Sequence, residues 1–434
     1  MASLEALTVA DALRYKAQTR GTKNSVIMLE HSQTVASALK VLAAHRILSA
    51  PMVVSPGLED MEEMGDGEAT PGPSLIGWVD ITDILRSLLD QLHTKRGAAL
   101  PTAMLALMSD LESVSPAFSS RSLISLKGGE DKSLVYQGEM GAPLLATIRD
   151  CFLNNAGQSG RVVHRLAVFD AQGQIHAVLS QLDVVSYLAA HPELLGPAAQ
   201  CSLAQLGLLP SGPGHVVCLE PHVPTLLSLE KLLAAGVSGG AVVAADGSGA
   251  LIANLSISDL RCIQPDQLGV LALPVAEFLA VLHNTSYLGY SQKASAQASN
   301  PFFACGPRSA SRQLSGRRGH PGALQAAEPA SNTPPPPSRL RGALAGVDEA
   351  EVDDSVRCLT CDQNAQLHAV LHMFADNHVH RVYVLDPAAR PQVSAVLTPT
   401  DILRWLVTHG PAAATPPGTP SLAPTPAPTP MAMV

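Results

Sequence analysis

The sequence predicts a mixed α/β fold built from four copies of one β-α-β-β-α unit, each about 60 residues long. Three observations predict it. The same order of apolar strand, helical stretch, second strand and third strand recurs four times along the 434 residues. The helical stretches carry apolar residues on one face, and each third strand runs directly into a helix with an Asp near its start. A repeated order of parts is the sequence signature of a repeat architecture.

The first half of each copy is a short apolar strand followed by a helix. The strands are expected at 25–29, 133–136, 215–219 and 355–359. In the first copy, apolar residues fall at i, i+3, i+4 and i+7, at Val35, Ala38, Leu39 and Leu42. The same spacing begins at Leu367 in the fourth copy. This period is typical of a helix with one buried face.

The second half of each copy is a pair of strands and a final helix. The second strands are expected at 47–54, 164–170, 236–243 and 380–386, and the strand-to-helix junctions at 77–89, 177–188, 251–263 and 395–406. A β-α-β step makes its two strands parallel and joins them by a right-handed crossover. Because a three-stranded sheet with two helices cannot cover both its faces, we expect the first copy to pair with the second and the third with the fourth.

Composition limits the class of protein. Hydrophobic residues make up 46% of the chain, so a sizeable core is expected, and the net charge of −9 argues against nucleic-acid binding over the whole surface. The seven cysteines are odd in number and irregularly spaced, which favours reduced thiols in a cytosolic or nuclear protein. The most apolar run, 268–282, is shorter than the roughly 20 residues that span a bilayer, so no membrane segment is expected.

Three stretches are expected to be disordered because they offer too little apolar surface to offset their ordering entropy. They are an acidic insert at 59–74, a basic Pro- and Ser-rich linker at 286–346 and a Pro, Ala and Thr tail at 411–434. The linker could instead be a docking or phosphorylation segment around Ser309, Ser311 and Ser315. The four copies are then expected at 5–95, 110–192, 200–285 and 347–410.

This order of parts resembles the cystathionine-beta-synthase (CBS) domain. Four copies in one chain resemble the gamma, energy-sensing subunit of AMP-activated and sucrose-non-fermenting-type protein kinases. The second and fourth copies enter their second strand with His164-Arg165 and His380-Arg381, whereas the first and third enter at 48–51 and 237–240 with a Ser and small residues. Gamma subunits show this alternation. The resemblance implies two Bateman modules that form a flat disc and bind AMP, ADP or ATP between repeats.

The resemblance assigns ribose binding to the Asp of each final helix, because an ionised carboxylate can accept hydrogen bonds from both ribose hydroxyls. These residues are Asp83, Asp183, Asp259 and Asp401. It adds hydroxyl contacts at Ser180, Ser256, Thr398, Thr82, Thr400 and Ser238. A second interpretation stays open, because Ser or Thr three residues before an Asp is also an ordinary helix N-terminus.

The His-Arg pairs are the expected phosphate ligands, since Arg offers a fixed fork of donors and His can donate from a ring nitrogen. They are His164, Arg165, His380 and Arg381. The chain departs from gamma subunits in three places. Leu48 and Gln181 stand where the family has Arg and Lys, and Asp80 stands where the other copies have a hydroxyl. These changes predict weaker nucleotide binding or fewer working sites. Asp183 remains where animal gamma subunits have Arg.

Zinc is a competing interpretation, because Cys358 and Cys361 precede His368 and His372. The spacing is poor, and the repeat places Cys358 in a strand and Cys361 in the turn after it. We therefore expect no metal. The sequence contains no phosphate-binding Gly-x-x-x-x-Gly-Lys loop and no Gly-x-Ser-x-Gly nucleophile turn, so no catalytic activity is expected.

The expected function is that of a regulatory subunit without catalysis. It would bind adenine nucleotides, with no other cofactor, and modulate a serine/threonine kinase through catalytic alpha-type and scaffolding beta-type subunits. Neither nucleic acid nor membrane is an expected partner, and the location would be the cytoplasm, the nucleus or both. Two alternatives remain. One is an interaction scaffold whose nucleotide sites have decayed, and the other is a sensor of an adenosyl ligand that regulates another enzyme.

Overall fold

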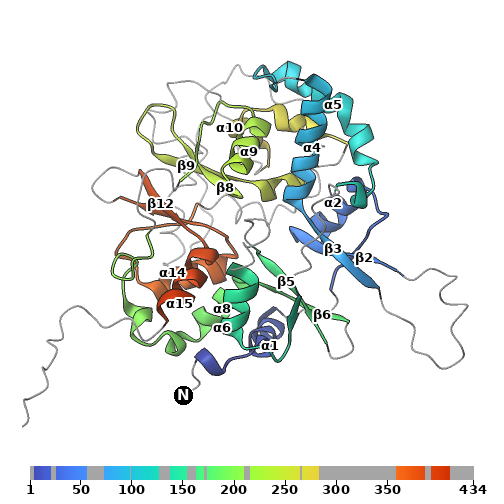
Figure 1. Cartoon of the computed structure of the whole chain (residues 1–434). Coiled ribbons are helices and arrows are strands. Elements are labelled where there is room, and N and C mark those ends of the chain that lie inside the picture. Colours follow the sequence, from blue (N-terminus) through green and yellow to red (C-terminus); the bar gives the residue numbers. More distant parts are fainter. Residues whose placement is uncertain are drawn as a thin grey trace, which may run out of the picture.

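The computed structural model describes residues 4–20, 26–55, 73–97, 99–126, 137–153, 163–170, 174–209, 216–263, 266–282, 358–386 and 392–410. The fold is mixed α/β, with four three-stranded sheets (Figure 1). In every sheet the first two strands are parallel and the last two antiparallel. The predicted strand order is therefore present four times. The expected linker and tail, and nearly all of the acidic insert, lie outside the described residues.

Each sheet and its helices form one unit. The first unit contains β1 (Leu29–Glu30), α2 (Val35–Ala44), β2 (Ser49–Val54), β3 (Ser74–Asp80) and α4 (Ile81–Arg96). The second contains β4 (Gln137–Glu139), α6 (Leu144–Thr147), which continues as π-helical η3 (Ile148–Leu153), β5 (Arg165–Phe169), β6 (Ile175–Ser180) and α8 (Gln181–Ala190).

The third unit contains β7 (Cys218–Leu219), α9 (Thr225–Ala234), β8 (Gly239–Val243), β9 (Leu251–Ser256) and the 3₁₀ helix η5 (Ile257–Cys262). The fourth contains β10 (Thr360–Cys361), α14 (Leu367–Asn377), β11 (Val382–Leu385), β12 (Val393–Leu397) and α15 (Pro399–His409). The remaining elements are η1 (Leu4–Ala6), α1 (Val9–Arg20), α5 (Met104–Ser119), η2 (Leu123–Leu126), η4 (Pro192–Gln200), η6 (Leu268–Ala272) and α10 (Val275–Leu282).

Several predicted boundaries are wrong. β1 has only two residues and begins where the predicted strand 25–29 ends, and β10 lies beyond the predicted 355–359. The parallel partner pairs with only two residues of each of these edge strands. Cys361 consequently lies in β10 rather than in a turn, and Cys358 precedes that strand. The predicted strand 133–136 falls outside the described part of the chain.

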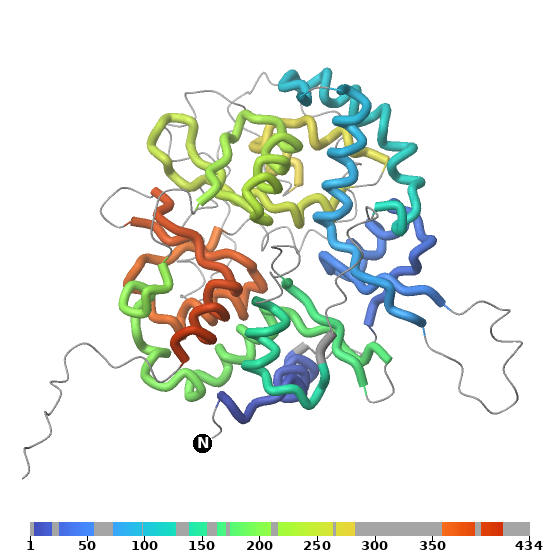
Figure 2. Tube along the Cα trace, viewed as in Figure 1, coloured from blue at the N-terminus to red at the C-terminus, as the bar shows by residue number. Residues whose placement is uncertain are grey.

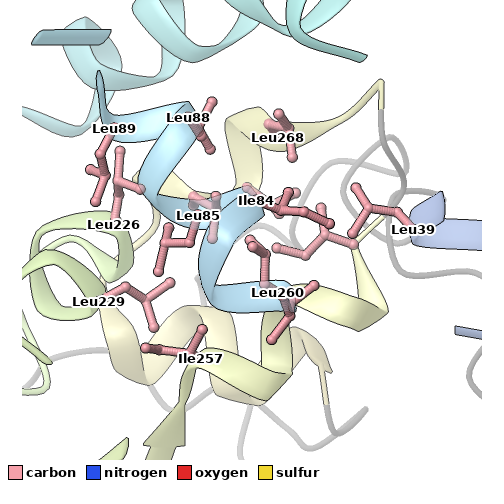
Figure 3. Packing of buried hydrophobic residues seen from close by; sticks show 14 of the residues in the cluster. Leu39, Ile84, Leu85, Leu88, Leu89, Leu226, Leu229, Ile257, Leu260 and Leu268 are labelled. Carbon is pink, nitrogen blue, oxygen red and sulfur yellow. The ribbon is translucent and has the colours of Figure 1, made fainter. Parts of the chain in front are cut away.

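The predicted helix stripes form the core. Val35, Ala38, Leu39 and Leu42 on α2 are fully buried, as are Leu367, Val370, Leu371 and Phe374 on α14. One apolar cluster joins the first unit to the third, and a second joins the second unit to the fourth. In Figure 3, Leu85 and Leu89 of α4 lie on the side of Leu226, and Leu88 lies beside Leu268 of η6.

The four units lie around a common centre (Figures 1 and 2). In this view the third unit is above, the first to the right, the second below and the fourth to the left. Polar contacts between sheets link the expected partners: Arg165 of the second unit reaches Ser49 of the first, and Tyr383 of the fourth reaches Asn254 of the third. The sequence did not predict that the apolar cores would run across these pairs. In the described part of the chain, no helix combines the length and apolar character needed to cross a bilayer.

Candidate functional site

The Asp at the start of each final helix caps that helix. The carboxylate Oδ2 of Asp83, Asp183, Asp259 and Asp401 accepts the backbone N–H three residues earlier, at 3.1, 2.8, 2.8 and 2.9 Å. The earlier residue caps the helix in return, which completes a capping box in all four units. The helix-terminus interpretation is therefore confirmed. The box engages only one carboxylate oxygen, so it does not exclude a ligand at the other.

The four carboxylates differ in their surroundings. The Asp401 side chain is 29% exposed and lies 3.6 Å from Arg404 of its own helix, and Asp83 lies 3.8 Å from Arg86 in the same way. The Asp183 side chain is only 1% exposed and accepts a hydrogen bond from Lys16 at 2.9 Å. Burial raises the pKa of Asp259 to about 6, against the opposing effect of the Ser256 N–H and of Arg381 and Arg261. Equivalent positions in the repeat thus have different chemistry.

Arg381 lies at the junction of the third and fourth units. Its guanidinium donates to the hydroxyl oxygens of Ser238 and Ser256, at 2.5 and 3.3 Å. It also lies directly against the backbone of Gly239, where a Cβ atom would be 2.4 Å from Cζ. Among the described residues, no carboxylate lies within ion-pair distance of this guanidinium. Arg381 is therefore held by neutral hydroxyls and keeps its charge available.

Arg165 holds the same register position at the junction of the first and second units. Arg165 is opposite Ser180 in its sheet, and Arg381 directly precedes Val382, which pairs with Leu397. Arg165 donates to the Ser49 hydroxyl at 3.1 Å, as Arg381 does to serines, but it also lies 3.9 Å from the Asp80 carboxylate. Asp80 caps α4 just as Ser256 caps η5. At the position of Asp80 and Ser256, the two junctions therefore differ by one negative charge.

Histidines extend this polar centre. Burial lowers the pKa of His380 to about 3, and the positive charges of Arg165, Arg381 and Arg261 add to the effect. Burial also lowers the pKa of His164, against the opposing attraction of Asp80. As whole residues, His164 and His380 are nevertheless exposed. The charges of Arg165 and Arg381 both act on His164 and on His380, so the two predicted His-Arg pairs lie near one another.

Two of the predicted residues make contacts within the protein. The hydroxyl of Thr400 is buried and donates to the Gln181 side-chain oxygen at 2.7 Å, and the Gln181 amide donates to the Val163 carbonyl at 2.8 Å. These bonds tie the fourth unit to the second. Thr82 contributes its backbone N–H to the Asp80 carboxylate. Ser180, Ser256 and Thr398 lie at the helix starts as predicted, where each accepts a backbone N–H.

The zinc interpretation finds no support. His368 and His372 stack edge to face with ring centroids 5.2 Å apart, and His372 lies 3.4 Å from Asp376. Burial raises the pKa of the Cys361 thiol to about 12, which disfavours the thiolate that zinc requires. Within the described ranges, no group of three or more potential ligands could hold a metal ion.

Sequence reasoning missed two charged residues. Arg261 lies two residues after Asp259. Its positive charge lowers the pKa values of Arg165, His380 and Asp259. The equivalent residues of the other units are buried and apolar, namely Leu85, Val185 and Leu403. Alignment of the four copies would have revealed this exception. Lys16 lies in α1, outside the repeat, and no pattern in the sequence marks it.

Comparison with protein-family models finds no match, and neither does a search of curated protein sequences. Solved structures do match. A Methanocaldococcus jannaschii protein described as a proposed archaeal homologue of gamma-AMPK is 11% identical, with a TM-score of 0.48, and the match covers 89% of this chain and 97% of that one. A CBS-domain protein from Agrobacterium tumefaciens is 15% identical, with a TM-score of 0.25, over 42% of this chain and 92% of that one. CBSX2, solved in complex with AMP, is 16% identical with a TM-score of 0.24, over 39% and 92%. The structures that this chain is similar to include CBS-domain proteins.

Proposed function

We propose that the chain is a regulatory protein without catalytic activity, in which four CBS repeats pair as two Bateman modules in a flat disc and bind an adenine nucleotide. The observation that carries the proposal is the Arg381 guanidinium, held by the hydroxyls of Ser238 and Ser256. A guanidinium with neutral partners can add charge-assisted hydrogen bonds to a phosphate without breaking an ion pair. Asp259 is close enough to interact with it and can accept a ribose hydroxyl.

The junction of the third and fourth units is the favoured site. At the other junction Asp80 partly neutralises Arg165, and a carboxylate near a phosphate would repel it. His164 and His380 would complete the phosphate environment from the centre. Arg261 would supply a cation that Leu48 and Gln181 do not.

The regulatory mechanism would be a population shift. AMP, ADP and ATP differ in phosphate charge, so they can favour different arrangements of the units only through different contacts with Arg165, Arg261 and Arg381. The sequence resemblance supports a kinase complex as the partner, with alpha-type catalytic and beta-type scaffolding subunits, in the cytoplasm or nucleus.

The test is a calorimetric and thermal-shift titration with AMP, ADP, ATP and S-adenosylmethionine. A ligand that binds only the folded state raises the unfolding free energy by about 2.7 kcal/mol at a hundred times its Kd. We expect a nucleotide to bind and Arg381→Met to weaken binding at least tenfold. Arg165→Met is the matched control, because it removes the same group at the equivalent position and should weaken binding less.

A scaffold function is the second candidate, and the Asp80–Arg165 contact favours it because an internally satisfied site needs no ligand. Absence of binding by all four compounds at millimolar concentration would refute the nucleotide proposal and leave the scaffold. Binding of S-adenosylmethionine that survives Arg381→Met would indicate an adenosyl-ligand sensor instead.

A further inference from the structure

Helix α1 is fixed to the second unit although it precedes the first in the sequence. The Val9 N–H donates to the Ala142 carbonyl at 3.0 Å, and the Leu144 N–H donates to the Leu7 carbonyl at 2.7 Å. On the next turns of α1, the Tyr15 ring packs edge to face on Tyr187 of α8, with centroids 5.7 Å apart. In Figure 1, α1 lies beside β6 and α6. The position of Lys16 is therefore set by backbone bonds and ring packing around it.

Lys16 ends at the carboxylate expected to hold a ribose. Its ammonium donates to Asp183 Oδ2 at 2.9 Å and to the Val178 carbonyl at 2.8 Å. The same Oδ2 atom also accepts the N–H and the hydroxyl of Ser180, at 2.8 and 2.6 Å. Three donors therefore converge on one oxygen of Asp183, and the Asp183 side chain has almost no exposed surface.

The fourth unit provides an internal comparison. Asp401 accepts the same two bonds from Thr398, at 2.9 and 2.6 Å, yet its side chain is 29% exposed. The chain segment that packs on the fourth unit as α1 packs on the second is 201–209, where the Leu203 N–H donates to the Ala365 carbonyl. In the described residues, this segment brings no cation to Asp401, whose ion pair is with Arg404 of its own helix. Of these two units, only the second therefore has its carboxylate covered by a cation from the preceding segment.

We propose that α1 blocks the second unit: the Lys16 ammonium pairs with the Asp183 carboxylate, and the buried carboxylate is thereby closed to ribose hydroxyls. The nucleotide stoichiometry of the chain is then set by the other units. This inference rests on the proposed function for its consequence, although the contact itself does not. To use Asp183, a ligand must displace Lys16 and separate an ion pair whose carboxylate is buried, which lowers its affinity about a hundredfold.

The first experiment compares two isosteric variants by calorimetry with the nucleotide that binds the intact chain. Asp183→Asn should leave the stoichiometry unchanged and the Kd within about twofold. Asp259→Asn, the matched change in the third unit, should weaken binding at least tenfold. Loss of a binding event, or a Kd raised tenfold, in Asp183→Asn would overturn the blocking role of α1.

The second experiment opens the site. Lys16→Met keeps the length of the side chain without its charge, and it should add one binding event that disappears in the double variant Lys16→Met/Asp183→Asn. If the added event is absent, Lys16 is not the closing group.

A ligand-free measurement separates the blocking role of α1 from the nucleotide proposal. The shifts in Tm of Lys16→Met and Asp183→Asn should not add in the double variant, because each removes the same interaction. Additive shifts would overturn the contact whether or not the chain binds a nucleotide. Non-additive shifts in a chain that binds none would refute the proposed function and leave the Lys16–Asp183 contact established.

Discussion

Replacing Gly239 by Ala tests whether Arg381 is the group that holds a nucleotide. The added Cβ would lie 2.4 Å from Arg381 Cζ and 2.5 Å from one terminal nitrogen. Ordinary contacts begin at 3.4 Å, so the guanidinium must move by about 1 Å. A shift of this size misaligns its hydrogen bonds with Ser238 and Ser256. The perturbation therefore acts on Arg381 without changing that residue.

The two expected effects differ in size. Arg381 is a flexible side chain that can turn toward solvent, so the unfolding free energy should fall by only about 0.5–1.5 kcal/mol, the worth of an ordinary hydrogen bond. Hydrogen bonds to a charged group contribute about 1.5–3 kcal/mol, so nucleotide affinity should fall roughly tenfold to a hundredfold. Calorimetry measures the affinity, and denaturant unfolding without ligand measures the stability.

Gly240→Ala is the control, because it should affect stability strongly and nucleotide affinity little. A Cβ there would meet the Val217 backbone oxygen at 2.6 Å and a Leu232 methyl at 2.9 Å, neither of which can turn away. This variant should lose stability rather than affinity. An unchanged nucleotide Kd in Gly239→Ala would contradict the role of Arg381. A further loss of affinity when Gly239→Ala is added to Arg381→Met would contradict it as well.

Three other expectations follow from single contacts. Burial raises the pKa of Asp259 to about 6, above its value in the unfolded chain, so its contribution to stability is present at pH 4 and is lost as the pH rises through about 6. Urea unfolding should therefore give a lower unfolding free energy at pH 7.5 than at pH 4.5, and this decrease should be smaller in Asp259→Asn than in the original chain. Thr400→Val leaves the buried Gln181 oxygen without its donor, so it should lower the unfolding free energy by about 1–3 kcal/mol and leave the nucleotide Kd unchanged. A raised Kd would indicate that Thr400 belongs to the binding site. Leu85→Ala should lower the unfolding free energy by about 2–5 kcal/mol, since the side chain is fully buried. Leu105→Ala should change it by less than about 0.5 kcal/mol because Leu105 is 73% exposed, and equal effects of the two variants would contradict the assigned core.

The repeat made most of the fold predictable. The spacing of Val35, Ala38 and Leu42 defines a buried helix face, and all three side chains are buried. The edge strands were placed less well, because two-residue strands such as β1 depend on their partner rather than on local residue preference. The crossed apolar cores were not predictable from the helix stripes, since a stripe shows which face is buried but not which neighbour covers it.

The sequence predicted which residue types occupy the candidate site, but it did not predict their burial or their ion pairs. The sequence placed an Asp at the start of all four final helices, and local spacing cannot distinguish Asp183, which Lys16 covers, from Asp401, whose side chain is 29% exposed. The covering residue is 167 positions away in the sequence, so only the tertiary structure relates the two. Arg261 is the opposite case, because its exceptional position is visible as soon as the four copies are aligned.

The four-fold repetition of the backbone therefore does not produce four equal sites. In the half of the chain formed by the first two units, Asp80 lies by Arg165 and Lys16 by Asp183, so both charged groups have internal partners. In the other half, the described residues give Arg381 two hydroxyl partners and no carboxylate within ion-pair distance, and burial disfavours the charge on Asp259. A bound phosphate would compensate the first of these, and a ribose hydroxyl would donate to the second. A ligand consequently has more to gain from the third and fourth units, and its binding should stabilise that half of the molecule more than the other.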